Sequence, residues 1–182
     1  MTTPDKSGLI EPLDACHRQH VCRMTMEYIA RAEQLYDREF PTIPVLFDLK
    51  GRAAGMHKVN NNARVSRYNP YIFAKYFDDN LATTVPHEVA HYIVDMMYNA
   101  RSVKPHGREW RLVMHSFGVE AKATGNYDLS GIPVRKYNRH AYQCGCTTHQ
   151  ISSARHNKIV QGKARYYCRR CNSTLVPVEA EK

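Results

Sequence analysis

The sequence predicts an α+β fold in two parts: a larger helical domain with a small antiparallel sheet, followed by a small β-rich domain. Three observations lead to this prediction. Residues 85–98 read VPHEVAHYIVDMMY, an apolar helical run that contains two histidines and a glutamate. Four of the six cysteines lie close together near the C-terminus. The segment 135–170 is rich in Lys and Arg and contains no Asp or Glu.

The length and composition limit the class of protein. At 182 residues and 21.0 kDa the chain can form one domain with a proper core and a small appendage. A content of 43% hydrophobic and 24% charged residues excludes a disordered or low-complexity chain. No apolar run approaches the roughly 18 residues of a membrane span, and the N-terminus lacks the apolar region of a secretory signal. We therefore expect a cytoplasmic monomer with no membrane partner.

The first part of the chain has helical periodicity followed by strand-like runs. From about Leu13 to Phe40, apolar residues recur mostly every three or four positions, which predicts an amphipathic helix that ends before Pro41. Glycines and a run of three asparagines then separate short β-type segments, which we expect to form strands at 45–50, 56–59 and 63–68. Pro70 opens a short helix to about residue 78.

Two further helices are predicted before the residue pattern changes from helical to β-type. Thr83 or Thr84 can cap a helix that continues to about residue 100, with Pro86 tolerated in its first turn. A second helix follows from residue 108 and ends at Gly118. Short β-type runs with interleaved basic and aromatic residues start near residue 137. We place the domains at residues 10–130 and 137–178.

The motif H-E-x-x-H supplies the groups of a catalytic metal site. His87 and His91 are four residues apart, so they share one helix face and can direct their rings to one metal ion. Histidine nitrogens bind zinc well, and an open coordination position activates water. Glu88 lies next to these ligands and is the predicted catalytic acid/base. The alternative is a buried histidine pair without metal.

The third ligand can come from either of two residues. His106 follows His91 by fifteen residues, in a loop between two predicted helices, and we favour it. Glu109 is the competitor, because some zinc hydrolases use a glutamate from a following helix. The extended metzincin pattern is excluded, since Val94 and Met97 stand where it requires Gly and His.

The C-terminal cysteines indicate a second, structural zinc site. Cys168 and Cys171 have the two-residue gap of a zinc knuckle, and Cys146 and His149 repeat it. We predict these four residues as the ligands, with Cys144 as the alternative for one of the first two. A closed site of this kind stabilises a segment too short to fold on apolar burial alone. The other two cysteines, in the first helix, are expected to be core residues.

The same segment carries the basic charge of the chain. Its nine Lys and Arg leave 17 elsewhere, which equals the number of Asp and Glu. Lys and Arg with interleaved tyrosines are typical of a surface that binds single-stranded nucleic acid, although a solvated basic face without a partner is the alternative. The predicted nucleic-acid contacts are Arg155, Lys158, Lys163, Arg165, Arg169 and Arg170, with Tyr137, Tyr142, Tyr166 and Tyr167 as the candidate stacking residues.

The stretches PHEVAHYIV and KPHGREWRLVM resemble the SprT family of zinc metalloproteins, whose eukaryotic relative Spartan is a DNA-dependent protease. The similarity extends to AAGMHKVNNNARVSRYNP and to the cysteine-containing C-terminal segment, covering roughly residues 13–176. It implies a zincin-like protease domain followed by a zinc ribbon. It also implies His87, His91 and His106 as ligands of a catalytic zinc and Glu88 as the catalytic acid/base.

These observations lead to two functional hypotheses. The first is a zinc-dependent metalloprotease that hydrolyses peptide bonds in proteins bound or crosslinked to DNA, with one catalytic and one structural zinc. Its DNA partner is expected to be single-stranded or distorted. The second is a zinc-binding, nucleic-acid-binding regulatory protein with little or no protease activity. A glutamate placed beside an open metal position favours the first, because a purely structural site is normally closed by a fourth ligand.

Overall fold

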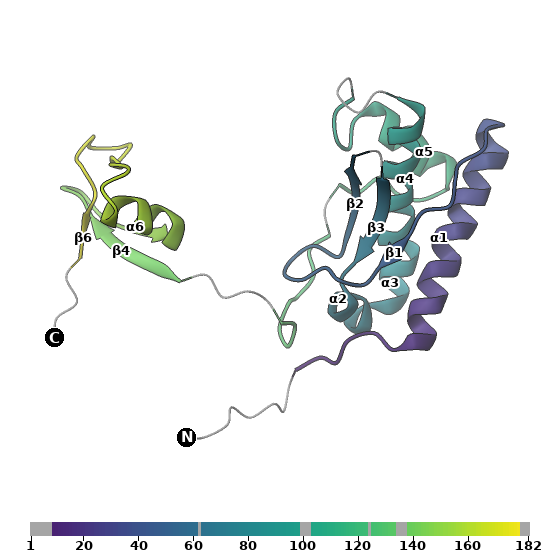
Figure 1. The fold of residues 1–182 in the computed structure, drawn as a ribbon, viewed down its shortest axis with the longest axis horizontal. Coiled ribbons are helices and arrows are strands. Elements are labelled where there is room, and N and C mark those ends of the chain that lie inside the picture. The colour runs from purple at the N-terminus through teal and green to yellow at the C-terminus, as the bar shows by residue number, and fades with distance from the viewer. Residues whose placement is uncertain (1–8, 62, 99–102, 124, 134–137, 179–182) are drawn as a thin grey trace. The chain divides into compact units, whose positions relative to one another are not determined.

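The computed structural model describes residues 9–61, 63–98, 103–123, 125–133 and 138–178. The chain divides into two compact units, residues 1–134 and 135–182 (Figure 1). Both units combine helices with small sheets, so the chain has the predicted α+β character. Each unit is described by itself.

The first unit begins with a long helix, α1 (Ala15–Tyr36). Asp14 caps it by accepting a hydrogen bond from the His17 amide, and Asp37 ends it in the left-handed conformation. The buried face of the helix includes Val21, Ile29 and Ala32. The sequence prediction was wrong for Cys16, which is exposed, whereas Cys22 is partly buried.

A three-stranded sheet follows, with strand order β1-β3-β2. The hairpin β2 (Gly55–Asn60) and β3 (Ala63–Tyr68) is antiparallel, but β1 (Val45–Leu46) pairs with β3 in parallel. The sheet is therefore mixed and not purely antiparallel as predicted. Among the described strands, this order leaves β2 with a free edge.

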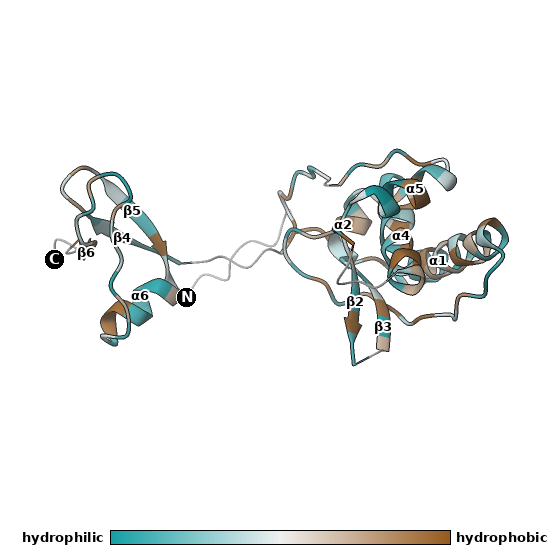
Figure 2. Cartoon of the chain, turned by 90° about the horizontal axis from the view of Figure 1, so that it is seen from above, coloured by the Kyte–Doolittle hydropathy of each residue, from teal (hydrophilic) through white to brown (hydrophobic). Residues whose placement is uncertain are grey.

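The described residues of this unit also form the helices α2 (Pro70–Lys75), α3 (Phe77–Ala82), α4 (Thr84–Met97) and α5 (Arg108–Ser116). Helix α4 is central, because it packs against α1, α3, α5 and β2. Its residues Val89, Ala90 and Ile93 are fully buried and form a core with Trp110 and Val113 of α5. In Figure 2 these helices carry both apolar and hydrophilic residues, the pattern of elements that bury one face.

In its described residues, the second unit combines a small antiparallel sheet with one helix. Strands β4 (Arg139–Gln143), β5 (Thr148–Ser152) and β6 (Val176–Pro177) have the order β5-β4-β6. Helix α6 (Ser153–Val160) was not predicted, because its basic residues obscure any apolar periodicity. The buried core holds only Tyr142, Ile151, Cys168 and Leu175 among the described residues. So small a core needs a further source of stability.

In the part of the chain that the structure describes, no helix has the length and apolar character needed to cross a membrane.

Candidate active site and metal centres

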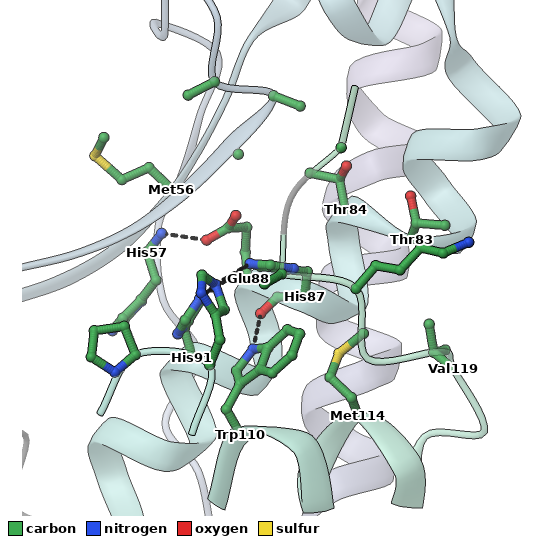
Figure 3. A pocket seen from close by; sticks show the side chains of 18 of the residues that line it. Met56, His57, Thr83, Thr84, His87, Glu88, His91, Trp110, Met114 and Val119 are labelled. Carbon is green, nitrogen blue, oxygen red and sulfur yellow. Dashed lines mark hydrogen bonds between the residues drawn. The ribbon is translucent and has the colours of Figure 1, made fainter. Parts of the chain in front are cut away.

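Three histidine rings converge at the bottom of a cleft in the first unit. The Nε2 atom of His91 lies 3.2 Å from that of His87 and 3.0 Å from that of His106, and the latter two are 3.0 Å apart. His87 and His91 come from one face of α4, and His106 comes from the loop before α5. The three nitrogens form a nearly equilateral triangle (Figure 3 labels His87 and His91).

This triangle cannot be satisfied by hydrogen bonds among the rings alone. Each Nε2 either carries a proton or offers a lone pair. With three mutually adjacent nitrogens, at least two must be in the same state, and such a pair repels. A single cation accepts all three lone pairs at once. For zinc at about 2.0–2.1 Å in tetrahedral geometry, the nitrogens would lie roughly 3.3 Å apart, close to the spacing seen here.

The backbone around His106 is arranged to turn its ring toward the other two. His106 has φ +55°, a left-handed conformation that is uncommon for a residue other than glycine. Gly107 follows, where an added Cβ would lie 2.8 Å from the Lys104 carbonyl oxygen. Glu109, the competing ligand, does not belong to the group of metal-capable atoms, which comprises His87, His91 and His106 among the described residues.

Trp110 supports all three rings from below. Its ring centroid lies 4.7 Å from those of His87 and His106 and 5.7 Å from that of His91. The indole Nε1–H donates to the His87 carbonyl oxygen at 3.3 Å, and the side chain is only 1% exposed (Figure 3). A rigid aromatic surface of this kind restricts the rotation of the three histidine rings. Sequence reasoning did not assign Trp110 a role.

Burial keeps the three histidines neutral, the form that binds metal. It lowers the pKa of His87 to about 4, with a contribution from His106 and an opposing hydrogen bond to the Lys122 backbone. Burial and the two neighbouring rings lower the pKa of His91 to about 3. The pKa of His106 is lowered by burial as well. At neutral pH the group therefore presents lone pairs rather than charges.

Glu88 occupies the same cleft with its carboxylate almost fully buried. Burial raises the pKa of Glu88 to about 7, and the His57 amide, which donates to Oε2 at 2.6 Å, opposes this rise (Figure 3). A carboxyl group that titrates near neutrality is well suited to accept and return a proton.

The cleft has a volume of about 860 Å³. Apolar side chains line much of it, including Met56, Val59, Met114 and Val119, while Asp79, Glu120 and Lys122 contribute charges. Part of its wall comes from residues that follow α5, namely 119–120, 122–123 and 125–127. Tyr127 connects this segment to α3 by donating a hydrogen bond to Asp79 at 2.6 Å. An open, largely apolar channel of this size can accept a segment of polypeptide.

The second unit gathers four thiols into one group, formed by Cys144, Cys146, Cys168 and Cys171. The Sγ of Cys146 lies 3.5 Å from that of Cys144 and 3.7 Å from that of Cys168. The structure thus brings Cys144, the alternative of the sequence prediction, into one group with Cys146, Cys168 and Cys171. His149 lies beside the group, with Nε2 3.3 Å from the Cys144 sulfur. The one-residue gap of Cys144-Gly-Cys146 concealed this arrangement, because zinc knuckles usually have longer gaps.

Hydrogen bonds prepare part of this group for metal. Bonds from the hydroxyl and backbone of Ser173 lower the pKa of Cys171 to about 6. Backbone bonds from Cys171 and Arg170 lower the pKa of Cys168. Thiolates are the form that binds zinc, and a four-thiolate set fits a closed structural site.

The predicted nucleic-acid residues are all exposed on the second unit: Arg155, Lys158, Lys163, Arg165, Arg169 and Arg170. Of the candidate stacking residues, Tyr167 is 53% exposed and Tyr166 partly so. Tyr142 is fully buried, so the sequence prediction was wrong for this ring. Tyr137 lies outside the described residues.

Comparison with known proteins decides the family. The sequence profile of the SprT-like family matches residues 25–157. This chain belongs to the SprT-like family. It is 35% identical to "Protein SprT" of Vibrio parahaemolyticus over 154 residues, which cover 84% of this chain and 89% of that protein. It is also 35% identical to "Protein SprT" of Pseudomonas paraeruginosa over 168 residues, 90% of each chain. No solved structure matches this SprT-like chain.

The buried carboxyl of Glu88 yields a first prediction, on stability. Its folded pKa of about 7 exceeds the ordinary value of 4.5, so it favours the folded state at low pH and this contribution is lost as the pH rises to 7. In metal-free protein, Glu88→Gln should therefore raise the free energy of unfolding at pH 8 by about 1–3 kcal/mol and leave it nearly unchanged at pH 4. Urea denaturation at both pH values measures this. An equal effect at both would contradict the account.

The ligands of the second site yield another prediction. Cobalt bound by four thiolates has a stronger sulfur-to-metal charge-transfer band than cobalt bound by three thiolates and one histidine. His149→Ala should leave the band of this site unchanged, whereas Cys144→Ser should weaken it. Absorption spectroscopy of the cobalt-loaded variants distinguishes a site of four thiolates from a site of three thiolates and His149. The reverse pattern would restore His149 as the ligand.

Proposed function

We propose that this SprT-like chain is a zinc-dependent peptidase that acts on proteins bound or crosslinked to DNA. The observation that supports hydrolysis most directly is the convergence of three neutral histidines beside a buried carboxyl group in an open cleft. Zinc is the metal that three histidines and an open position most commonly hold in hydrolases. The arrangement leaves space for both water and substrate.

The chain's own residues divide the work of peptide hydrolysis. When bound by the three histidines, zinc would polarise the peptide carbonyl and lower the pKa of water. Glu88 accepts a proton from the attacking water and delivers it to the departing amine nitrogen. A pKa near 7 gives Glu88 access to both its deprotonated and its protonated form at neutral pH, as these two steps require. Trp110 packs against all three histidine rings and holds them in place.

The free edge of β2 supports a polypeptide substrate. Gly55, His57 and Val59 line the cleft, and no strand covers this side of β2 in the described part of the chain. An extended segment can add to such an edge through backbone hydrogen bonds, which give affinity with little sequence selectivity. This mode suits an enzyme that acts on many different DNA-bound proteins.

The second unit supports DNA association. The six exposed cations that the sequence predicts as contacts can bind phosphates, and the exposed Tyr167 can stack on an unpaired base. Arg155 lies over the ring of Tyr166, 5.5 Å from the centroid, so cations and aromatic rings occur together. Stacking requires bases that are not paired, which favours single-stranded or distorted DNA.

The third prediction concerns Glu88 as the catalytic acid/base. Glu88→Gln keeps the size and polarity of the side chain but cannot accept a proton, so casein cleavage should fall by at least about 100-fold. Zinc content and DNA affinity should stay at the wild-type level. Retained cleavage would exclude the proposed role. Loss of zinc would mean that the residue supports the metal site instead.

The fourth prediction concerns the basic surface. Replacing Arg155, Lys158 and Arg169 by Gln should weaken binding of single-stranded DNA. The slope of log affinity against log salt should fall by about 0.7 for each phosphate that the variant no longer neutralises. A matched control replaces three exposed cations of the first unit, Arg38, Lys50 and Arg111. Equal weakening in the two triple variants would show that only net charge matters and would contradict a dedicated surface.

A further inference from the structure

The free edge of β2 has a definite hydrogen-bonding pattern. The Ser66 amide of β3 donates to the Pro44 carbonyl oxygen and so points away from β2. His57 lies opposite Ser66 in the hairpin. Because the Ser66 amide points away from β2, His57 and Ser66 form a pair that exchanges no backbone hydrogen bonds. The backbone groups of His57 therefore point outward from the sheet. By the two-residue alternation of a strand, those of Gly55 and Val59 do the same.

Glu88 lies directly against this edge. Its Oε2 accepts the outward-pointing His57 amide at 2.6 Å (Figure 3). Its side chain also lies over Gly55: a Cβ added there would be 2.6 Å from both Cγ and Oε1 of Glu88 and 2.8 Å from Cγ2 of Thr84. Contacts this short do not occur in folded proteins, so the position requires glycine. The φ of Gly55 is not in the left-handed region, and the need is for space alone.

We propose that β2 positions the catalytic glutamate, with Gly55 giving the carboxylate room and the His57 amide holding one of its two oxygens. This inference rests on the proposed peptidase function. Gly55 and His57 are thereby positioning residues that act through Glu88.

The two contacts fix the side chain in complementary ways. A glutamate has three rotatable side-chain bonds, and burial without a hydrogen bond would leave its carboxylate unsatisfied. The amide selects one orientation and satisfies Oε2, so that Oε1 remains free to exchange a proton. The close approach at Gly55 brings α4 near enough to β2 for this bond to form. The catalytic group is therefore positioned from the sheet as well as from its own helix.

The arrangement also limits how a substrate can pair with β2. An extended chain can bond to the outward groups of Gly55 and Val59, but the His57 amide is already engaged by Glu88. The amides of His57 and Val59 therefore have different tasks although both lie on the same edge of β2. The His57 amide serves the proton transfer, and the Val59 amide serves substrate binding.

Proline substitutions separate these tasks, because proline removes the amide hydrogen and is tolerated where that hydrogen points away from the sheet. His57→Pro and His57→Ala both lose the imidazole, but only the first loses the amide donor. We expect kcat for peptide cleavage to be at least about 10-fold lower in His57→Pro than in His57→Ala, with KM values within about threefold of each other. Val59→Pro, the control on the same edge, should instead raise KM. Equal kcat in the two His57 variants, or a difference confined to KM, would overturn the proposal.

A measurement independent of activity tests the close approach at Gly55. Gly55→Ala should lower the midpoint of urea unfolding in the wild-type background, because the new methyl group displaces Glu88. In a Glu88→Ala background most of the clash is absent, so Gly55→Ala should lower the midpoint of urea unfolding by clearly less. An equal decrease in both backgrounds would show that Gly55 is not needed to make room for Glu88. If the wild-type protein cleaves no peptide, the proposed peptidase function is refuted. The comparison of unfolding midpoints still tests whether Gly55 makes room for Glu88.

Discussion

The candidate site of the first unit depends on one electrostatic constraint: three imidazole nitrogens lie within 3.2 Å of one another and cannot all be satisfied by hydrogen bonds among themselves. Two costly features make sense as means of holding this arrangement: His106 adopts a left-handed conformation, and Glu88 is buried beside the rings. Each of them reduces stability when taken by itself. Trp110 packs beneath the rings as part of the core and restricts their movement.

Burial sets the chemistry of the site in two directions at once. It lowers the pKa values of His87 and His91 and raises that of Glu88. The three histidines therefore stay neutral while Glu88 titrates near neutral pH. The apolar face of α4 that forms the core also provides this environment, so packing and chemistry share one element. In the second unit the core is small, and a metal held by four thiolates would supply the missing stability.

The sequence predicted the elements with strong periodicity or a defined spacing. The helix that carries His87 and His91 and the loop that carries His106 could be placed because ligands four residues apart on a helix have one geometry. The parallel pairing of β1 could not be predicted, since a two-residue strand has too little pattern. The choice between His149 and Cys144 could not be made from the sequence, because spacing does not determine which side chain a turn directs inward. The roles of Gly55, His57 and Trp110 depend on contacts between elements distant in sequence.

The most direct test of the central claim uses Trp110, the only tryptophan in the chain, which contacts all three histidine rings. Metal-free protein is titrated with cobalt while the fluorescence of Trp110 is followed. Bound cobalt quenches a nearby indole, so we expect one of two bound equivalents to quench the fluorescence strongly. Replacing His91 by Ala should abolish this quenching while one equivalent still binds the thiol group. Unchanged fluorescence on cobalt binding, or full quenching in the variant, would contradict a metal held by His87, His91 and His106.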